Sequence, residues 1–165
     1  MDPTIGDRRS VELAKRLRKS AADVAEPQRT KILGTLPNTL FISHSSLDDK
    51  FIKQLNVGSE VPQEESIWWI CGCFFPDPFY HSLKTGQAEA YERTVGLALL
   101  ASVRVLVVWS PNALRSDYVR AEVLIAIEEA KKLAVYLAPS APSFPFEAPQ
   151  VADGDSLRRF LRSWN

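Results

Sequence analysis

The stretch VRVLVVWSPNALRSDYVRAEVLIAIEEAKK, residues 103–132, determines the fold class of this chain. It begins with an apolar run, residues 103–109, which is interrupted only by Arg104, is rich in β-branched side chains and is typical of a strand buried on both faces. Ser110 followed by Pro111 is a helix-start signal, and Ser116 provides a second one a few residues later. The stretch therefore predicts a buried strand, a short helical turn and a main helix.

The rest of the chain continues this alternation of apolar strands and helices. Strands are predicted at residues 39–43, 66–75, 103–109 and 133–138, and helices at residues 46–55, 87–101, 117–131 and 156–164. Continuous apolar strands that alternate with helices predict a parallel α/β sheet with right-handed crossovers and the strand order 2-1-3-4. Residues 139–149 contain four prolines, and no fifth strand is evident after them.

Helix ends and the ligand crevice follow from the same pattern. Ser46 is predicted to cap the first helix of the sheet domain, with Asp48 and Asp49 at the positive end of its dipole. Asp155 or Ser156 is predicted to cap the last helix. In a sheet of this order the ligand crevice lies beyond the carboxyl ends of the first and third strands.

The composition is that of an ordinary globular protein. Of 165 residues, 45% are apolar and 24% are charged, and the 20 basic and 20 acidic residues balance. This excludes a disordered chain and predicts no direct nucleic-acid or membrane binding through bulk charge. The most apolar stretch, residues 95–109, is too short to span a bilayer, and no signal-peptide core is visible. Two cysteines cannot form a disulfide framework, so we expect a cytoplasmic protein.

Residues 1–37 are predicted to form an N-terminal amphipathic helix and a linker, ahead of an α/β domain over residues 38–165. The helix spans about residues 8–25 and carries Leu13 and Leu17 on one side, with basic residues around the rest. It either docks on the domain through its leucines or forms an arm for a partner or nucleic acid. We expect docking, because a charge run is usually a solvated face.

Several familiar chemistries are not indicated. The chain has neither a GxGxxG after its first strand nor a GxxxxGK[ST], so those nucleotide loops are missing. Cys71 and Cys73 lie in the middle of a predicted strand, where buried packing is favoured over a zinc site, and no metal is expected. His44 beside Ser45 does not predict a serine hydrolase, because adjacent residues rarely act as base and nucleophile and no G-x-S-x-G is present.

Two segments resemble the Toll/interleukin-1 receptor (TIR) domain family, especially its bacterial members. LFISHSSLDDKFIKQL, residues 40–55, is similar to the family's first strand, loop and first helix, and residues 103–132 are similar to its third strand and third helix. The likeness covers about residues 39–138. It implies a flavodoxin-like three-layer α/β fold, with a parallel sheet of four to five strands and helices on both faces.

The resemblance also implies an activity. Many TIR domains are NAD nucleosidases or cyclases, which release nicotinamide and form ADP-ribose or a cyclic ADP-ribose isomer. Their essential glutamate lies in an S-x-W-x-x-x-E pattern, which Ser116, Tyr118 and Glu122 match with tyrosine in place of tryptophan. Glu122 is therefore the expected catalytic residue. NAD is expected as substrate, no cofactor is implied, and bacterial antiviral defence is the expected role.

The chemistry is reasonable for a carboxylate. As neutral nicotinamide leaves, the ribose becomes oxocarbenium-like at C1′, and a nearby negative charge stabilises it. Glu122 and Tyr118 are four residues apart and share a helix face. From the residues alone, the more common alternative is that Glu122 is one of many solvated helix glutamates. The resemblance favours the catalytic role.

The remaining candidates follow the first and third strands. The predicted substrate-binding residues are Ser43, His44, Ser45, Ser46, Trp109 and Tyr118. Residues 43–46, the serine-rich turn, match the family loop that contacts the nucleotide, and hydroxyl and N–H groups at a helix start suit a pyrophosphate. The alternatives are that Ser46 merely caps the helix and that Trp109 belongs to the core. Residues 79–81 lie in a loop that closes over substrate or meets another subunit in the family, or else form a plain surface loop.

A second function class remains open. The family includes adaptors without catalysis, which act by pairing with other TIR domains, and the basic N-terminal helix fits such an interaction module. Family enzymes often need oligomers to complete their site. Self-association through TIR surfaces is therefore expected in either case.

Overall fold

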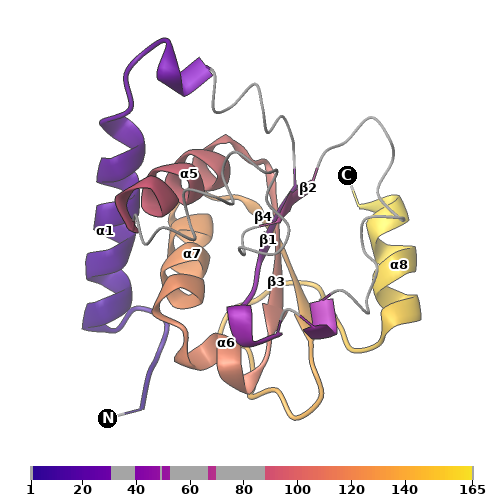
Figure 1. Ribbon diagram of the computed structural model, residues 1–165. Helices are drawn as coiled ribbons and strands as arrows, with labels where there is room; N and C mark the ends of the chain where they lie inside the picture. The colour runs from indigo at the N-terminus through magenta and orange to yellow at the C-terminus, as the bar shows by residue number, and fades with distance from the viewer. Residues whose placement is uncertain (1, 31–39, 49, 53–66, 70–87, 165) are drawn as a thin grey trace.

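The computed structural model of this chain contains a five-stranded parallel sheet (Figure 1). It describes residues 2–30, 40–48, 50–52, 67–69 and 88–164. The strands are β1 (Leu40–Ser43), β2 (Ile67–Trp69), β3 (Arg104–Trp109), β4 (Lys132–Leu137) and β5 (Gln150–Val151). Their order is β2-β1-β3-β4-β5, which confirms the predicted 2-1-3-4 arrangement and adds a strand at one edge.

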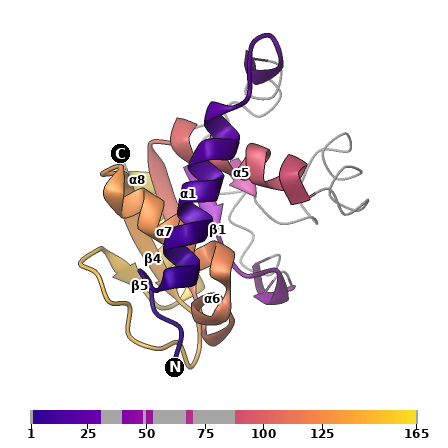
Figure 2. The same cartoon turned by 90° about the vertical axis from the view of Figure 1, so that its left-hand side faces the viewer.

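Helices cover both faces of this sheet, as predicted. They are α1 (Arg8–Ala22), α5 (Ala88–Ala101), α6 (Pro111–Arg115), α7 (Asp117–Glu128) and α8 (Gly154–Ser163), with a 3-10 turn η1 at Ser46–Asp48. Figure 1 shows α5 and α7 on one side of the sheet and α8 on the other. Helix α1 lies outside α5 and α7 and packs on both (Figure 2). The result is a flavodoxin-like three-layer fold with one additional outer helix.

The continuous apolar strands are explained by this layering. Along β3, Val105, Val107 and Trp109 face the core cluster formed with α1, α5 and α7. The alternating residues Leu106 and Val108 face the second core cluster, to which α8 contributes. Because successive side chains of a strand point to opposite faces, a strand that is covered on both sides must be apolar throughout. All six residues of β3 are buried.

The two helices that follow β3 begin where the sequence predicts, at Ser110-Pro111 and at Ser116. The Ser110 hydroxyl accepts a hydrogen bond from the backbone N–H of Ala113, and Pro111 occupies the first turn of α6. Ser116 caps α7 in the same way through the N–H of Val119. The predicted extent of α7 is too long, however. The helix ends at Glu128 because the chain takes a left-handed conformation at Ala130, with φ 52°, and turns directly into β4.

Other boundaries also differ from prediction. β5 pairs with β4 after the proline-rich segment, although two edge residues are too few to show a strand pattern in the sequence. Asp153 caps α8 by accepting from the N–H of Ser156, so neither Asp155 nor Ser156 is the cap. No helix within the described ranges has both the length and the apolar character that a membrane crossing requires.

The N-terminal helix docks on the domain through its apolar side, as expected. Leu13, Ala14 and Leu17 are buried in the same core cluster as the β3 side chains. The α1–α5 contact is close because α5 has Gly96 at the crossing point. A Cβ atom added to Gly96 would lie 2.4 Å from the carbonyl oxygen of Leu17. The absence of a side chain is therefore what lets the two backbones approach.

We expect Gly96→Ala to destabilise the fold by about 1–3 kcal/mol, because the new methyl group meets backbone rather than a movable side chain. The sign of this change in the free energy of unfolding is informative, since replacing glycine by alanine within a helix normally stabilises the helix by up to about 1 kcal/mol. Gly154→Ala is the matched control: its Cβ would make only an ordinary 3.5 Å contact with the flexible Arg158 side chain. Urea unfolding of both variants tests this, and equal or higher stability for Gly96→Ala would contradict the close approach.

Candidate active site

The carboxyl ends of β1 and β3 lie side by side at one edge of the sheet. Ser43 is the last residue of β1 and Trp109 the last of β3, and Ser43 is in register with Val107. The predicted crevice residues on these two strands therefore meet at the same edge, as the strand order requires. Helix α7, which carries the other two candidates, packs against this region of the sheet.

Glu122 lies against the end of β1. Its Oε1 accepts a hydrogen bond of 2.8 Å from the Ser43 hydroxyl, and the residue is only 2% exposed. Burial raises the pKa of this carboxyl to about 8, and the hydrogen bond from Ser43 opposes the rise only in part. The alternative that Glu122 is a solvated helix glutamate is therefore wrong. A buried carboxyl with a strongly raised pKa is a candidate functional group.

The other residues of the serine-rich turn differ in their exposure to solvent. His44 and Ser45 are buried, whereas Ser46 is exposed. The Ser45 hydroxyl accepts a hydrogen bond from the backbone N–H of Leu47. The predicted cap at Ser46 involves residue 49, which lies outside the described residues, so it stays a prediction. The chain then forms the 3-10 turn η1 before residues 50–52 become helical. The helical segment therefore begins at Ser46 as a 3-10 turn, and a short hydroxyl-to-backbone turn at Ser45 precedes it.

A polar cluster that the sequence did not single out as functional connects the two strand ends. Asp48 is 9% exposed and accepts two hydrogen bonds, one of 2.5 Å from the Ser110 hydroxyl and one of 2.9 Å from the Asn112 amide. The prediction that Asp48 serves the dipole of the first helix misses these contacts. The sequence signals were the Ser-Pro helix start, which identifies Ser110 as a cap, and its place after the third strand at the predicted crevice, but neither reveals Asp48 as its second partner.

Trp109 is a core residue. Its side chain is fully buried and packs edge-on against Phe144, with ring centroids 5.3 Å apart. Its indole Nε1 is buried and, among the described residues, has no hydrogen-bond partner. Of the two interpretations of Trp109 from sequence, the core one matches this environment, and Phe144 of the proline-rich segment covers it.

Tyr118 contacts a different carboxylate. Its hydroxyl donates to Glu92 Oε1 over 3.2 Å, and its ring packs edge-on against Tyr91. Glu92 is also held by Arg16 of α1, whose Nη2 lies 2.7 Å from the same oxygen. Burial, followed by the nearby Glu92, raises the pKa of Tyr118 and keeps its hydroxyl protonated. Tyr118 thus links α7 to α5 and, through Glu92, to α1.

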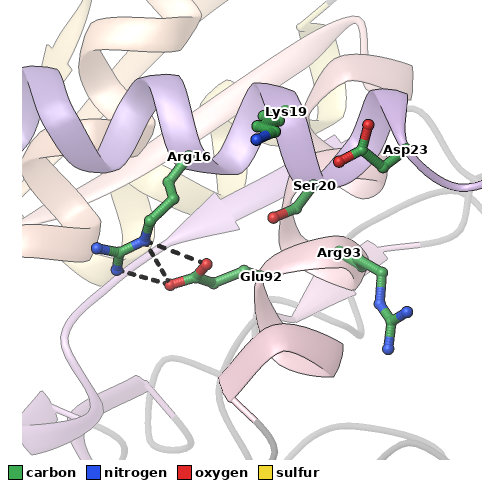
Figure 3. A pocket seen from close by; sticks show the side chains of 6 residues that line it. All are labelled: Arg16, Lys19, Ser20, Asp23, Glu92 and Arg93. Carbon is green, nitrogen blue, oxygen red and sulfur yellow. Dashed lines mark hydrogen bonds and ion pairs between the residues drawn. The ribbon is translucent and has the colours of Figure 1, made fainter.

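A surface hollow of about 390 Å³ lies beside this link, between α1 and α5 (Figure 3). It is lined by Arg16, Lys19, Ser20, Asp23, Glu92 and Arg93. Figure 3 shows the ion pair between Arg16 and Glu92 at one end of the hollow. None of the predicted site residues lines it, so the hollow is separate from the carboxyl edge of the sheet.

Some predictions lie outside the described residues. These are the cysteine pair at residues 71 and 73 and the aromatic loop at residues 79–81. Within the described residues, no group of three or more histidine, cysteine, aspartate or glutamate side chains is arranged to hold a metal ion.

The chain was compared with known proteins by sequence and by structure. No family model, no curated protein and no solved structure matches it.

Proposed function

We propose that this chain cleaves the nicotinamide–ribose bond of NAD, with Glu122 as its catalytic carboxylate. The observation that carries the proposal is a buried carboxyl hydrogen-bonded to Ser43 at the carboxyl edge of the sheet. Ligands of such α/β sheets bind at this edge. The substrate class comes from the resemblance of residues 39–138 to TIR domains.

The proposed reaction needs one well-placed negative charge. The C1′–N bond breaks and its electron pair leaves with nicotinamide, which departs as a neutral base. The positive charge that develops on the ribose is stabilised by the adjacent carboxylate. Water then adds at C1′ and loses a proton to give ADP-ribose, or an adenine nitrogen adds instead to give a cyclic isomer.

Access to Glu122 must open before this reaction. A residue that is 2% exposed cannot contact a ribose ring until neighbouring groups separate. The hydrogen bond from Ser43 involves only Oε1 of the carboxyl, so other neighbouring groups can separate from Glu122 while Ser43 stays in place. Under this proposal, substrate binding or self-association supplies that movement.

The proposal is tested by incubating the full chain with NAD at high protein concentration. Nicotinamide and the ribosyl product are measured by mass spectrometry, which also separates linear from cyclic ADP-ribose. Release of nicotinamide above a blank without protein is expected. No release, both in dilute solution and under conditions that drive self-association, would overturn the proposal.

The pH dependence follows from the raised pKa of Glu122. Only the ionised carboxylate stabilises the cation, so kcat/KM is expected to rise tenfold per pH unit below about pH 8 and to level off above it. Ser43→Ala removes the hydrogen bond that lowers this pKa, so the midpoint is expected to move to higher pH. A profile that is flat from pH 6 to 9 would contradict this assignment of the carboxylate.

One observation favours the alternative of a non-catalytic interaction module. With a pKa of about 8, Glu122 is mostly protonated at neutral pH and can act as an uncharged structural group beside Ser43. In that case Glu122→Gln preserves assembly, as measured by light scattering, and neither protein consumes NAD.

A further inference from the structure

The carboxylate of Asp48 joins the two segments that form the proposed site. Its Oδ2 accepts from the Ser110 hydroxyl over 2.5 Å, and its Oδ1 accepts from the Asn112 amide over 2.9 Å. Its own backbone N–H donates to the carbonyl oxygen of Ser45 over 2.9 Å. Asp48 is therefore fixed at its backbone to the serine-rich turn and at its side chain to the start of α6.

The position of this bridge in the fold matters. Asp48 follows β1, whereas Ser110 and Asn112 follow β3, and these strands are parallel neighbours with their carboxyl ends at the same edge. Ser110 is itself fixed, because its oxygen also accepts from the N–H of Ala113 as the cap of α6. The bridge thus connects the segments that follow the two strands and fixes the serine-rich turn relative to the start of α6.

The described contacts of Glu122 explain why the turn must be held. Ser43, at the beginning of the turn, is the hydrogen-bond donor to Glu122. Burial and this hydrogen bond are the causes of the altered pKa of Glu122, and no charged side chain among the described residues contributes. The ionisation of Glu122 therefore depends on how firmly Ser43 stays in place.

We propose that Asp48 is a positioning residue of the site: its bridge to Ser110 and Asn112 holds the serine-rich turn so that Ser43 stays on Glu122. The inference rests on the proposed NAD-cleaving function. Asp48 acts through Ser43 and contacts neither the scissile bond nor the acid. Two neutral donors on one buried carboxylate make this a rigid contact, because each oxygen has its own partner.

The test is Asp48→Asn, which keeps the size of the side chain. It replaces one carboxylate oxygen, which accepts a hydrogen bond, with an NH₂ group that cannot accept one from Ser110 or Asn112. One bridge contact is lost, Ser43 is released, and the midpoint of the kcat/KM profile is expected to shift to higher pH, as in Ser43→Ala. We expect kcat/KM at pH 7 to fall at least about tenfold. The double variant is expected to shift no further than Ser43→Ala alone, because both changes act through the same hydrogen bond.

The direction in which the midpoint of the pH profile moves distinguishes a positioning role of Asp48 from a simple effect of its charge. Removing a negative charge near Glu122 would by itself favour ionisation and move the midpoint to lower pH. A lower or unchanged midpoint in an active, folded Asp48→Asn protein would overturn the positioning role and leave the proposed function intact. Absence of turnover in the wild type would overturn the proposed function, and the inference with it.

A second variant keeps the test informative if Asp48→Asn does not fold. Asn112→Ala removes one donor of the bridge without changing charge and without affecting the cap at Ser110. Asn112→Ala is expected to shift the midpoint of the kcat/KM profile to higher pH by a smaller amount than Asp48→Asn. Glu147→Gln, at an exposed position, is the control and is expected to leave the profile unchanged.

Discussion

Glu122→Gln is expected to lower nicotinamide release by at least about 100-fold while the protein stays folded. Glutamine matches the shape of the buried side chain and still accepts a hydrogen bond from Ser43, but it carries no negative charge at any pH. Loss of a group that stabilises charge in a transition state typically costs two to three orders of magnitude in kcat. Glu122→Ala is expected to lower nicotinamide release by a similar factor, because the negative charge of Glu122, rather than its hydrogen bond, stabilises the transition state.

Two comparisons make this experiment decisive. Glu147→Gln makes the same chemical change at an exposed position and should retain full turnover. Thermal melting of each variant shows that lost activity is not lost structure. If Glu122→Gln and the wild type release nicotinamide at the same rate, Glu122 is not the catalytic carboxylate.

The sheet was predictable because its signals are local. A strand that is covered on both faces is expected to be apolar, and residues 105–109 show that pattern without interruption. The caps at Ser110 and Ser116 were equally readable, since a serine hydroxyl reaches an N–H only three residues away. Strand order then followed from the general preferences of α/β folds. By contrast, β5 has two residues and no local pattern, so the sequence did not reveal it.

The site was only partly predictable because its contacts are distant in sequence. The identity of Glu122 came from a motif, but its burial depends on which face of α7 meets the sheet. Apolar residues surround most of that helix, so the sequence does not mark one face as exposed. Asp48 and Ser110 are 62 residues apart, and Glu92 and Tyr118 are 26 apart. Such pairs become visible only when the fold brings the strand and helix ends together.

The N-terminal helix illustrates the same limit. Its leucine spacing predicted docking, and that docking is observed. The spacing could not reveal that Arg16 would hold the buried Glu92, on which Tyr118 also depends. The amphipathic pattern therefore predicts that α1 docks, but only the folded structure shows that α1 is connected through Glu92 to α7, the helix that carries Glu122.

Glu122→Gln is also expected to change how stability depends on pH, whatever the chain catalyses. The pKa of Glu122 is raised from 4.5 to about 8 on folding, so the folded state favours the protonated acid. Below pH 4.5 both states are protonated and the wild type pays no ionisation penalty. Between pH 4.5 and about 8 its stability falls with rising pH, and above that the loss is complete. The variant has no group to ionise there, so its stability relative to the wild type should increase across this window.

The expected size is on the order of 3 kcal/mol at pH 7, since each pKa unit corresponds to about 1.4 kcal/mol. For a chain of this length that is roughly 6–12 °C in Tm. The buried amide of glutamine adds a constant cost of about 1–3 kcal/mol, so the slope against pH is the quantity to compare. Chemical denaturation of both proteins from pH 5 to 9, with Glu147→Gln as a control that should run parallel to the wild type, measures it. A pH-independent difference between Glu122→Gln and the wild type would mean that Glu122 is not a buried acid with a raised pKa, and the catalytic role built on its ionisation would lose its physical basis.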